Sequence, residues 1–292
     1  MKKIVLISVL SFALLLAACG GAAQQPAAET ASEEIIVSET AEDGQNPVMN
    51  FVGSYSPEIT AASRPLMLVE CKGADSAAVT VMWPVCNGEV NCWTMTGKLD
   101  TETLTVEYTD GVHKTLRYGE DGKIASETGI YENGKGRVIF RQADNSVTWI
   151  DEQDHAADDL VFAFVVPQAT EDLDFYSGFS AMEKGLLESY ATDIRNACLD
   201  GNWEYIADLA RFPILVNGTS YADREAFLAL MAESTLSDAG RAALEEETCH
   251  DMFYNGQGLC LGAGQVWLLD LSYMTENEPS IQVISLNDIV SK

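Results

Sequence analysis

Basic residues are scarce in this chain of 292 residues, which has 17 Lys and Arg, 45 Asp and Glu, and only three His. The formal net charge at pH 7 is -28. A surface this acidic repels the phosphates of nucleic acids and the anionic headgroups of membranes. The sequence therefore argues against nucleic-acid binding and against tight binding along a membrane surface, whereas cationic partners, metal ions and simple solubility remain compatible with it.

The common signatures of catalysis and cofactor binding are also missing. The chain has no Gly-x-Ser-x-Gly elbow, no His-Glu-x-x-His helix and no Cys-x-x-Cys pair, which removes the commonest hydrolase, zinc and redox motifs. Residues 129–135 match most of a phosphate-binding loop, but Gly136 stands where Ser or Thr must hold magnesium. Because Asn133 and Gly134 lie between two strand-like runs, we predict a tight hairpin there and expect no cofactor.

Long apolar runs are absent except at the N-terminus. Lys2 and Lys3 precede the largely apolar residues 4–15, and small residues follow them up to Cys19. About 15 apolar residues are too few to span a hydrocarbon layer of ~30 Å but match the core of a signal peptide. The alternative is a short anchor helix that stays uncleaved. With either arrangement, most of the chain is expected outside the cytoplasm.

This N-terminal arrangement resembles a bacterial lipoprotein signal peptide, with the LAAC sequence of residues 16–19 as its lipobox. The resemblance implies cleavage before Cys19, a diacylglyceryl group on its sulfur, and a position on the extracytoplasmic face of the cell membrane. Two acyl chains hold a protein at a membrane durably. Cleavage removes two basic residues, so the remaining charge is 15 minus 45, or -30.

Six cysteines follow Cys19, and six cysteines allow about 15 complete pairings. We expect a disulfide between Cys86 and Cys92, because the residues between them have the composition of a hairpin tip. Disulfides and buried free thiols are both compatible with the remaining four. These are Cys71, Cys198, Cys249 and Cys260.

The first predicted domain covers residues 48–166 and follows an acidic tether, residues 19–47, that has no basic or aromatic residue. Short alternating runs separated by turn signals, such as Asp110-Gly111, predict an antiparallel β-barrel or sandwich. The expected strands are residues 50–55, 66–71, 78–83, 92–96, 103–108, 114–118, 136–141, 147–150 and 160–166. Residues 51–55 resemble the first strand of lipocalin-like barrels, which favours a closed barrel.

The second predicted domain covers residues 180–292, after a linker at residues 167–179, and its apolar residues have the period of helices. Leu187, Tyr190, Ile194 and Cys198 define the first helix, which ends at residues 200–202. A helix from Trp203, a strand at 211–216, helices near 224–233 and 238–247, and strands at 249–254, 259–271 and 280–286 are expected to follow. The whole chain is thus expected to be an all-β barrel domain followed by an α+β domain.

Residues 180–288 resemble an NTF2-like domain, a conical α+β fold. The matching segments are residues 200–203, 211–213, 216–218, 251–255 and 262–267. The resemblance implies a curved sheet around a pocket, and it implies no particular chemistry. Enzymes of this family place an Asp, Tyr or His in the cone and raise its pKa by burial.

Five residues are the candidates for such a role in this chain: Asp270, His250, Tyr221, Asp251 and Tyr254. Asp270 interrupts an apolar run, and strand alternation places it on the face of Val266 and Leu268. Cys249 and His250 are not expected to form a nucleophile and base pair, because neighbours in a strand point to opposite faces. The acidic run at residues 151–159 is compatible with a calcium loop, although a solvated loop is the more ordinary interpretation.

We expect a membrane-anchored extracytoplasmic lipoprotein whose role is non-enzymatic. It would bind a small ligand, a wall component or an envelope protein through the cone, the barrel or their junction. The alternative is an NTF2-like enzyme (an isomerase, dehydratase or hydrolase) that uses a buried acid in the cone. A third alternative is a structural protein with both pockets filled. An enzyme should place Asp270 or His250 in a closed-ended pocket with a perturbed pKa, whereas a binding module should not.

Overall fold

The computed structural model describes residues 46–57, 64–85, 88–158, 160–167, 176, 178–272 and 280–292. The predicted signal peptide, Cys19, most of the predicted tether and Cys86 lie outside these residues. The described residues belong to one compact unit, Gly44–Lys292, which contains two hydrophobic cores. None of its described helices combines the length and the apolar character that a membrane crossing requires.

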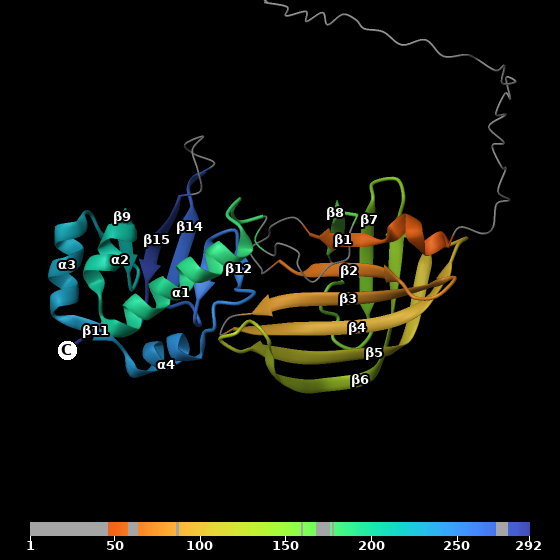
Figure 1. Cartoon of the computed structure of the whole chain (residues 1–292), viewed down its shortest axis with the longest axis horizontal. Coiled ribbons are helices and arrows are strands. Elements are labelled where there is room, and N and C mark those ends of the chain that lie inside the picture. The colour runs from red at the N-terminus through yellow and green to blue at the C-terminus, as the bar shows by residue number, and fades with distance from the viewer. Residues whose placement is uncertain are drawn as a thin grey trace, which may run out of the picture. The chain divides into compact units, whose positions relative to one another are not determined.

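The first half of the unit is an antiparallel sheet of eight strands that closes on itself (Figure 1). Each strand pairs with the next, and β8 returns to pair with β1, where Tyr55 faces Phe164. The expected β-rich antiparallel first domain is therefore confirmed. The strands are β1 (Gly53–Ser56), β2 (Leu66–Cys71), β3 (Ser76–Val85), β4 (Glu89–Asp100), β5 (Thr105–Tyr118), β6 (Ile124–Arg141), β7 (Ser146–Asp151) and β8 (Val161–Val166).

Two predicted turns in this sheet are wrong. β5 continues through Asp110 and Gly111, and β6 continues through Asn133 and Gly134. Gly111 pairs with Gly134, and the register shifts on both sides of this pair. With Asn133 at a φ of 60°, the segment is an irregularity within two long strands and not a hairpin. The phosphate-loop match thus lies within a strand and opens no helix.

The start of the first domain also differs from the prediction. Residues 47–51 form a 3-10 helix, η1 (Pro47–Phe51), so the strand predicted at residues 50–55 begins only at Gly53. The Asn46 side chain accepts a hydrogen bond from the Val48 N–H at 2.9 Å, and Pro47 supplies the fixed backbone angle of a helix start. Val48 and Phe51 are buried in the core of the first half.

A buried carboxylate, Asp151, organises part of that core. It accepts hydrogen bonds from the Tyr108 hydroxyl at 3.1 Å, the Tyr131 hydroxyl at 3.0 Å and the Asp154 N–H at 2.8 Å. Trp149, which is fully buried, donates to the Tyr108 hydroxyl at 3.0 Å. Burial is the main reason that the pKa values of both tyrosines are raised, so the hydroxyls stay protonated donors. The interpretation of residues 151–159 as a solvated loop is therefore wrong for Asp151.

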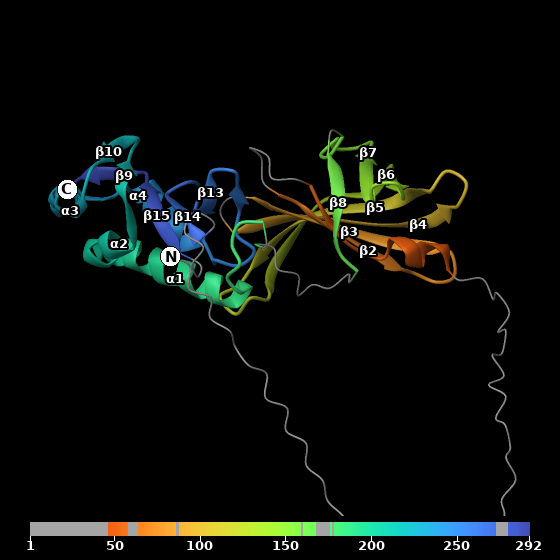
Figure 2. The ribbon, with the colours of Figure 1, turned by 90° about the horizontal axis from the view of Figure 1, so that it is seen from above.

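The second half contains four described helices and a six-stranded sheet in the order β10-β9-β15-β14-β13-β12. α1 and α2 lie along one face of this sheet (Figure 2). A two-stranded sheet pairs β11 with β16. The elements are α1 (Lys184–Asp200), α2 (Trp203–Leu209), β9 (Ala210–Val216), β10 (Thr219–Tyr221), α3 (Arg224–Ala232), β11 (Ser234–Leu236), α4 (Asp238–Glu246), β12 (Tyr254–Asn255), β13 (Gly258–Leu261), β14 (Val266–Asp270), β15 (Ile281–Leu286) and β16 (Ile289–Ser291).

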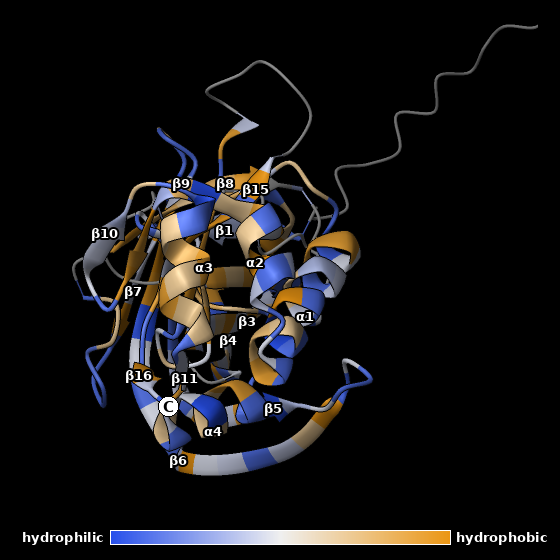
Figure 3. Ribbon diagram, turned by 90° about the vertical axis from the view of Figure 1, so that its left-hand side faces the viewer, coloured by the Kyte–Doolittle hydropathy of each residue, from blue (hydrophilic) through white to orange (hydrophobic). Residues whose placement is uncertain are grey.

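The four predicted helices are present for the expected physical reasons. α1 carries both hydrophobic and hydrophilic residues (Figure 3), and its buried members Leu187, Ala191, Ile194 and Cys198 recur at helical spacing. Gly201 ends α1 in the left-handed conformation, with a φ of 68°. Side-chain oxygens of Asn202, Asp223 and Ser237 cap the next three helices.

Two predicted strands of the second half are wrong. Of the predicted strand 249–254, only residue 254 is in a strand, β12. Cys249 and Asp251 have φ angles of 59° and 46°, which break an extended conformation. The predicted strand 259–271 is a hairpin of β13 and β14, since the chain turns between them with Gly262 and Gly264 at positive φ.

We predict that Asp151→Ala lowers the free energy of unfolding by about 2–4 kcal/mol, because it removes a buried acceptor from two tyrosine hydroxyls. Urea denaturation followed by tryptophan fluorescence measures this change. Glu152→Ala is the matched control, because this neighbouring acid is exposed and its loss should change stability by less than about 0.5 kcal/mol. Equal effects of the two variants would contradict the role given to Asp151.

Candidate functional site

A cleft of about 760 Å³ lies where the outer face of strands β3 to β6 meets the start of α1 and residues 250–251. Strand alternation explains its floor. Val81 of β3 and Trp93 of β4 are buried in the barrel core, so their neighbours Met82 and Thr94 face outward into the cleft. The volume lies within the range of about 300–1,000 Å³ that is typical of small-molecule sites.

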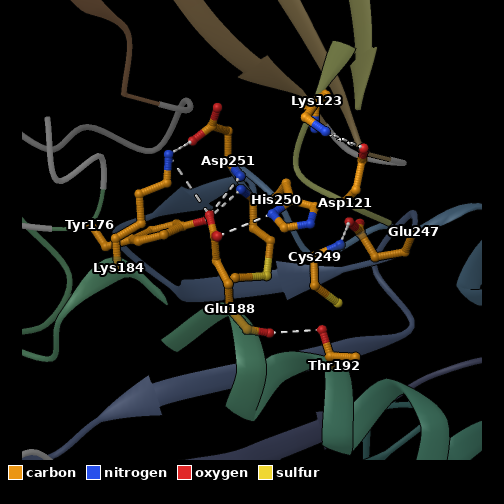
Figure 4. A network of polar contacts seen from close by, with 11 residues as sticks. Asp121, Lys123, Tyr176, Lys184, Glu188, Thr192, Glu247, Cys249, His250 and Asp251 are labelled. Atoms are coloured by element: carbon orange, nitrogen blue, oxygen red, sulfur yellow. Dashed lines mark hydrogen bonds and ion pairs between the residues drawn. The ribbon is translucent and has the colours of Figure 1, made fainter. Parts of the chain in front are cut away.

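The second wall of the cleft is built around Glu188, a buried carboxylate on α1 (Figure 4). It accepts hydrogen bonds from the Tyr176 hydroxyl at 3.1 Å and from the Asp251 N–H at 3.2 Å. Nδ1 of His250 lies 3.1 Å from its other oxygen. The fully buried Tyr176 hydroxyl also accepts from the Met252 N–H at 2.8 Å. These contacts attach residues 250–252 to α1.

Lys184 adds a cation to this wall. It lies one helical turn before Glu188, with Nζ 3.9 Å from a Glu188 oxygen, and it forms an ion pair with Asp251. The Asp251 side chain is only 5% exposed, whereas the Lys184 side chain is 29% exposed. The ammonium therefore stabilises two buried carboxylates and still reaches the cleft.

A second buried carboxylate, Glu247, stabilises the backbone next to residues 250–252. It accepts hydrogen bonds from the Cys249 N–H at 2.9 Å and the Gly262 N–H at 3.1 Å. Arg195 of α1 donates to the Glu247 carbonyl oxygen and, at 3.2 Å, to the Glu120 carboxylate in the turn between β5 and β6. Burial raises the pKa of Glu247, and the backbone donors offset only part of this effect.

Cys249 is not a nucleophile in this arrangement. Burial, together with the nearby Glu247 charge, raises the pKa of its thiol to about 12, so the reactive thiolate is not populated near neutral pH. His250 points its Nδ1 at Glu188. The absence of a Cys249 and His250 pair agrees with our prediction, but the reason given for it was wrong, because these residues are not in a strand.

Asp270 does not behave as an acid that transfers protons. As predicted, it shares a face of β14 with Val266 and Leu268, and the structure shows that this face is buried. Burial raises its pKa, but hydrogen bonds from Ser180, Ser272 and the Ser280 N–H outweigh burial, and the pKa lies below its usual value. The carboxylate thereby links the end of β14 to Ser180, which precedes α1, and to Ser280, which precedes β15.

The structure brings together only part of the predicted set. His250 and Asp251 line the cleft, but Asp270 and Tyr221 do not. Tyr254 is buried, and its ring is tilted against that of Tyr176, with 6.3 Å between the ring centroids. Sequence reasoning missed Tyr176, Lys184 and Glu188. The i, i+4 spacing of Lys184 and Glu188 was the one signal that could have pointed to the pair.

Among the described residues, the cysteines and acidic side chains add no further site. Cys71, Cys198 and Cys249 are free thiols, and the last two are buried. Cys86 lies outside the described residues, so its pairing with Cys92 stays a prediction. Within the described ranges, no group of three or more His, Cys, Asp or Glu residues is arranged to hold a metal ion.

Comparisons with protein-family models, with curated proteins and with solved structures found no match.

We predict that Asp270→Asn lowers the free energy of unfolding at pH 7 by about 1–3 kcal/mol, because the amide cannot accept all the hydrogen bonds of the carboxylate. The native pKa is lowered from 3.8, so the unfolded chain binds the proton more readily. The stabilisation is therefore complete above about pH 4 and is lost as pH falls through the native pKa.

Denaturant titrations of both proteins across this pH range measure the effect. The difference between wild type and Asp270→Asn should shrink as the pH falls below about 4. Asp193→Asn, at an exposed position of α1, serves as the control and should show little difference at any pH. A wild-type advantage that grows at acid pH would contradict this account of Asp270.

Proposed function

We propose that this chain is an extracytoplasmic lipoprotein, anchored in the cell membrane through a lipid on Cys19, and that it binds a small ligand without chemically changing it. The observation that carries the binding function is the cleft, which combines outward-facing apolar residues of β3 to β5 with a few charged side chains held in place by hydrogen bonds. This combination is typical of small-molecule sites.

The lipid anchor is supported by the N-terminal sequence. Two lysines, a short apolar run and small residues precede Cys19, which is the order of a signal peptide. An acidic tether would keep the compact unit away from anionic headgroups. The formal charge of -30 that remains after cleavage is compatible with this arrangement, since it opposes contact with the membrane surface.

We also propose that the second half is an NTF2-like domain and that the first half is related to lipocalin-like barrels. The order of two helices, a strand, further helices and then consecutive antiparallel strands supports the first assignment. Eight antiparallel strands, with β8 paired to β1, support the second. The proposed ligand site lies neither inside the barrel nor inside the cone, but at the junction of the two halves.

The contacts of Asp270 weigh against the alternative of an enzyme with a buried acid in the cone. Its carboxylate is occupied by donors and its pKa is lowered, whereas a general acid needs a raised pKa near the working pH. His250, the other candidate for a catalytic residue, directs Nδ1 to Glu188 and forms part of the cleft wall.

We predict that Cys19→Ala abolishes incorporation of an alkyne-tagged fatty acid when the chain is produced in a bacterium and labelled by click chemistry. The protein should also leave the detergent-extracted membrane fraction. Cys71→Ala is the matched control, because it removes a different free thiol and should retain the label. Persistent labelling of Cys19→Ala would overturn the lipid-anchor proposal.

We predict that Thr94→Trp blocks the cleft, because Thr94 is exposed and lies in its lining. Aliphatic carboxylates and amides from hexyl to decyl length are the probes. At about ten times the dissociation constant, a bound probe stabilises the wild type by about 1.4 kcal/mol, which raises the unfolding midpoint by about 3–6 °C.

Thermal unfolding of the lipidated protein in detergent solution measures this shift. Thr128→Trp, on an exposed position of β6 outside the lining, should respond as the wild type does, and Thr94→Trp should not respond. The binding proposal fails if no probe stabilises the wild type, or if Thr94→Trp is stabilised equally.

A further inference from the structure

The accessible polar groups of the cleft include two lysine ammonium groups, which are hydrogen-bond donors. Each lysine ammonium has three N–H groups. Lys114 donates to Glu127 at 2.7 Å and Lys123 donates to Asp121 at 3.0 Å, so each retains N–H groups for another acceptor. In contrast, the buried Glu188 already accepts from several donors. A ligand with acceptor oxygens therefore fits the cleft better than a cation.

His250 contributes a further polar atom on the side of the cleft that the β5–β6 turn forms. Its Nδ1 faces Glu188, and Figure 4 shows the ring between this carboxylate and the turn that carries Asp121 and Lys123. A Cβ added to Gly122 would lie 3.7 Å from Nε2. No hydrogen bond to Nε2 comes from the described part of the chain. When Nδ1 carries the proton that faces Glu188, Nε2 of the neutral ring is an acceptor, so it suits a donor group of a ligand and not an anionic oxygen.

The charge of the cleft differs from that of the chain as a whole. Its lining contains three lysines and three carboxylates, whereas the whole chain has a net charge of -28. An anion is thus repelled less here than over most of the surface.

The same cleft contains apolar surface that the chain leaves exposed. Ile124, at the start of β6, is 48% exposed, and it lines the cleft together with Met82, Val112 and Leu116. Burying aliphatic surface of this kind contributes a favourable free energy of about 25 cal/mol for each Å² removed from water. A ligand with an aliphatic body would supply this cover.

We infer that the cleft binds an amphipathic organic acid: an aliphatic body against Met82, Leu116 and Ile124, and a carboxylate within reach of the Lys114 and Lys123 ammonium groups. This assignment rests on the proposed binding function and names the chemical class of its ligand. It requires the anionic head as well as the apolar body, because the lysines and the exposed isoleucine face the same space.

The test compares hexanoate, octanoate and decanoate with hexanamide, octanamide and decanamide, which have the same aliphatic bodies and no charge. Dissociation constants come from the dependence of the unfolding midpoint of the lipidated protein on probe concentration. The carboxylates should bind at least about tenfold more tightly than the amides, which corresponds to about 1.4 kcal/mol. Raising the ionic strength should weaken only the carboxylates.

Lys114→Gln and Lys123→Gln should each weaken carboxylate binding by roughly three- to tenfold and leave amide binding unchanged. Lys98→Gln is the matched control, because Lys98 also forms an exposed ion pair, with Asp75, but does not line the cleft. Ile124→Ser should weaken both probe classes, since both use the apolar body.

The outcomes separate this inference from the proposed function. Amides that bind as tightly as carboxylates, or lysine variants that bind carboxylates as the wild type does, would overturn the assignment of an acid and leave a binding cleft. If neither class stabilises the wild type, or if Thr94→Trp binds both classes normally, the cleft is not a ligand site and both proposals fail.

Discussion

The Glu188 carboxylate is the contact on which the candidate site depends. A buried charge is costly unless several donors satisfy it, and here the three donors come from two separate places in the chain: the Tyr176 hydroxyl, and the His250 ring with the adjacent Asp251 N–H. The segment that carries His250 and Asp251 is not in a strand or a helix. Its conformation is therefore fixed by this carboxylate on one side and by Glu247 on the other.

The alternation of apolar residues predicted most of the barrel strands, but it did not predict their lengths. Asn133-Gly134 has the composition of a tight hairpin, and such a dipeptide also suits a bulge, because both need residues that accept a positive φ. What separates the two is whether the flanking runs pair with each other or with other strands. Here Gly134 pairs with Gly111 of β5, a contact that local sequence does not encode.

The candidate site was predicted only in part, for a related reason. Alternation grouped Asp270 with Val266 and Leu268 on one face of β14 but did not show that this face is buried. Its donors lie at residues 180, 272 and 280, and their combined effect on the carboxyl group follows only from the fold. Glu188 was missed because an i, i+4 pair with Lys184 is also typical of an exposed helix surface. In the structure Glu188 is buried, and its contacts with Lys184 and other donors stabilise the cleft wall.

The distribution of charge gives the cleft its chemical character. Across the whole chain, acidic residues outnumber basic ones by more than two to one, and dissolved salt screens the repulsion between exposed charges that lie more than about 10 Å apart. In the cleft, each lysine is paired with a carboxylate, so the local field is nearly balanced and the lysines of the exposed pairs keep spare donors. A binding site for an acid on an acidic protein requires such local compensation, because long-range attraction cannot bring the ligand in. Recognition must then come from short-range contacts with ammonium groups and aliphatic side chains.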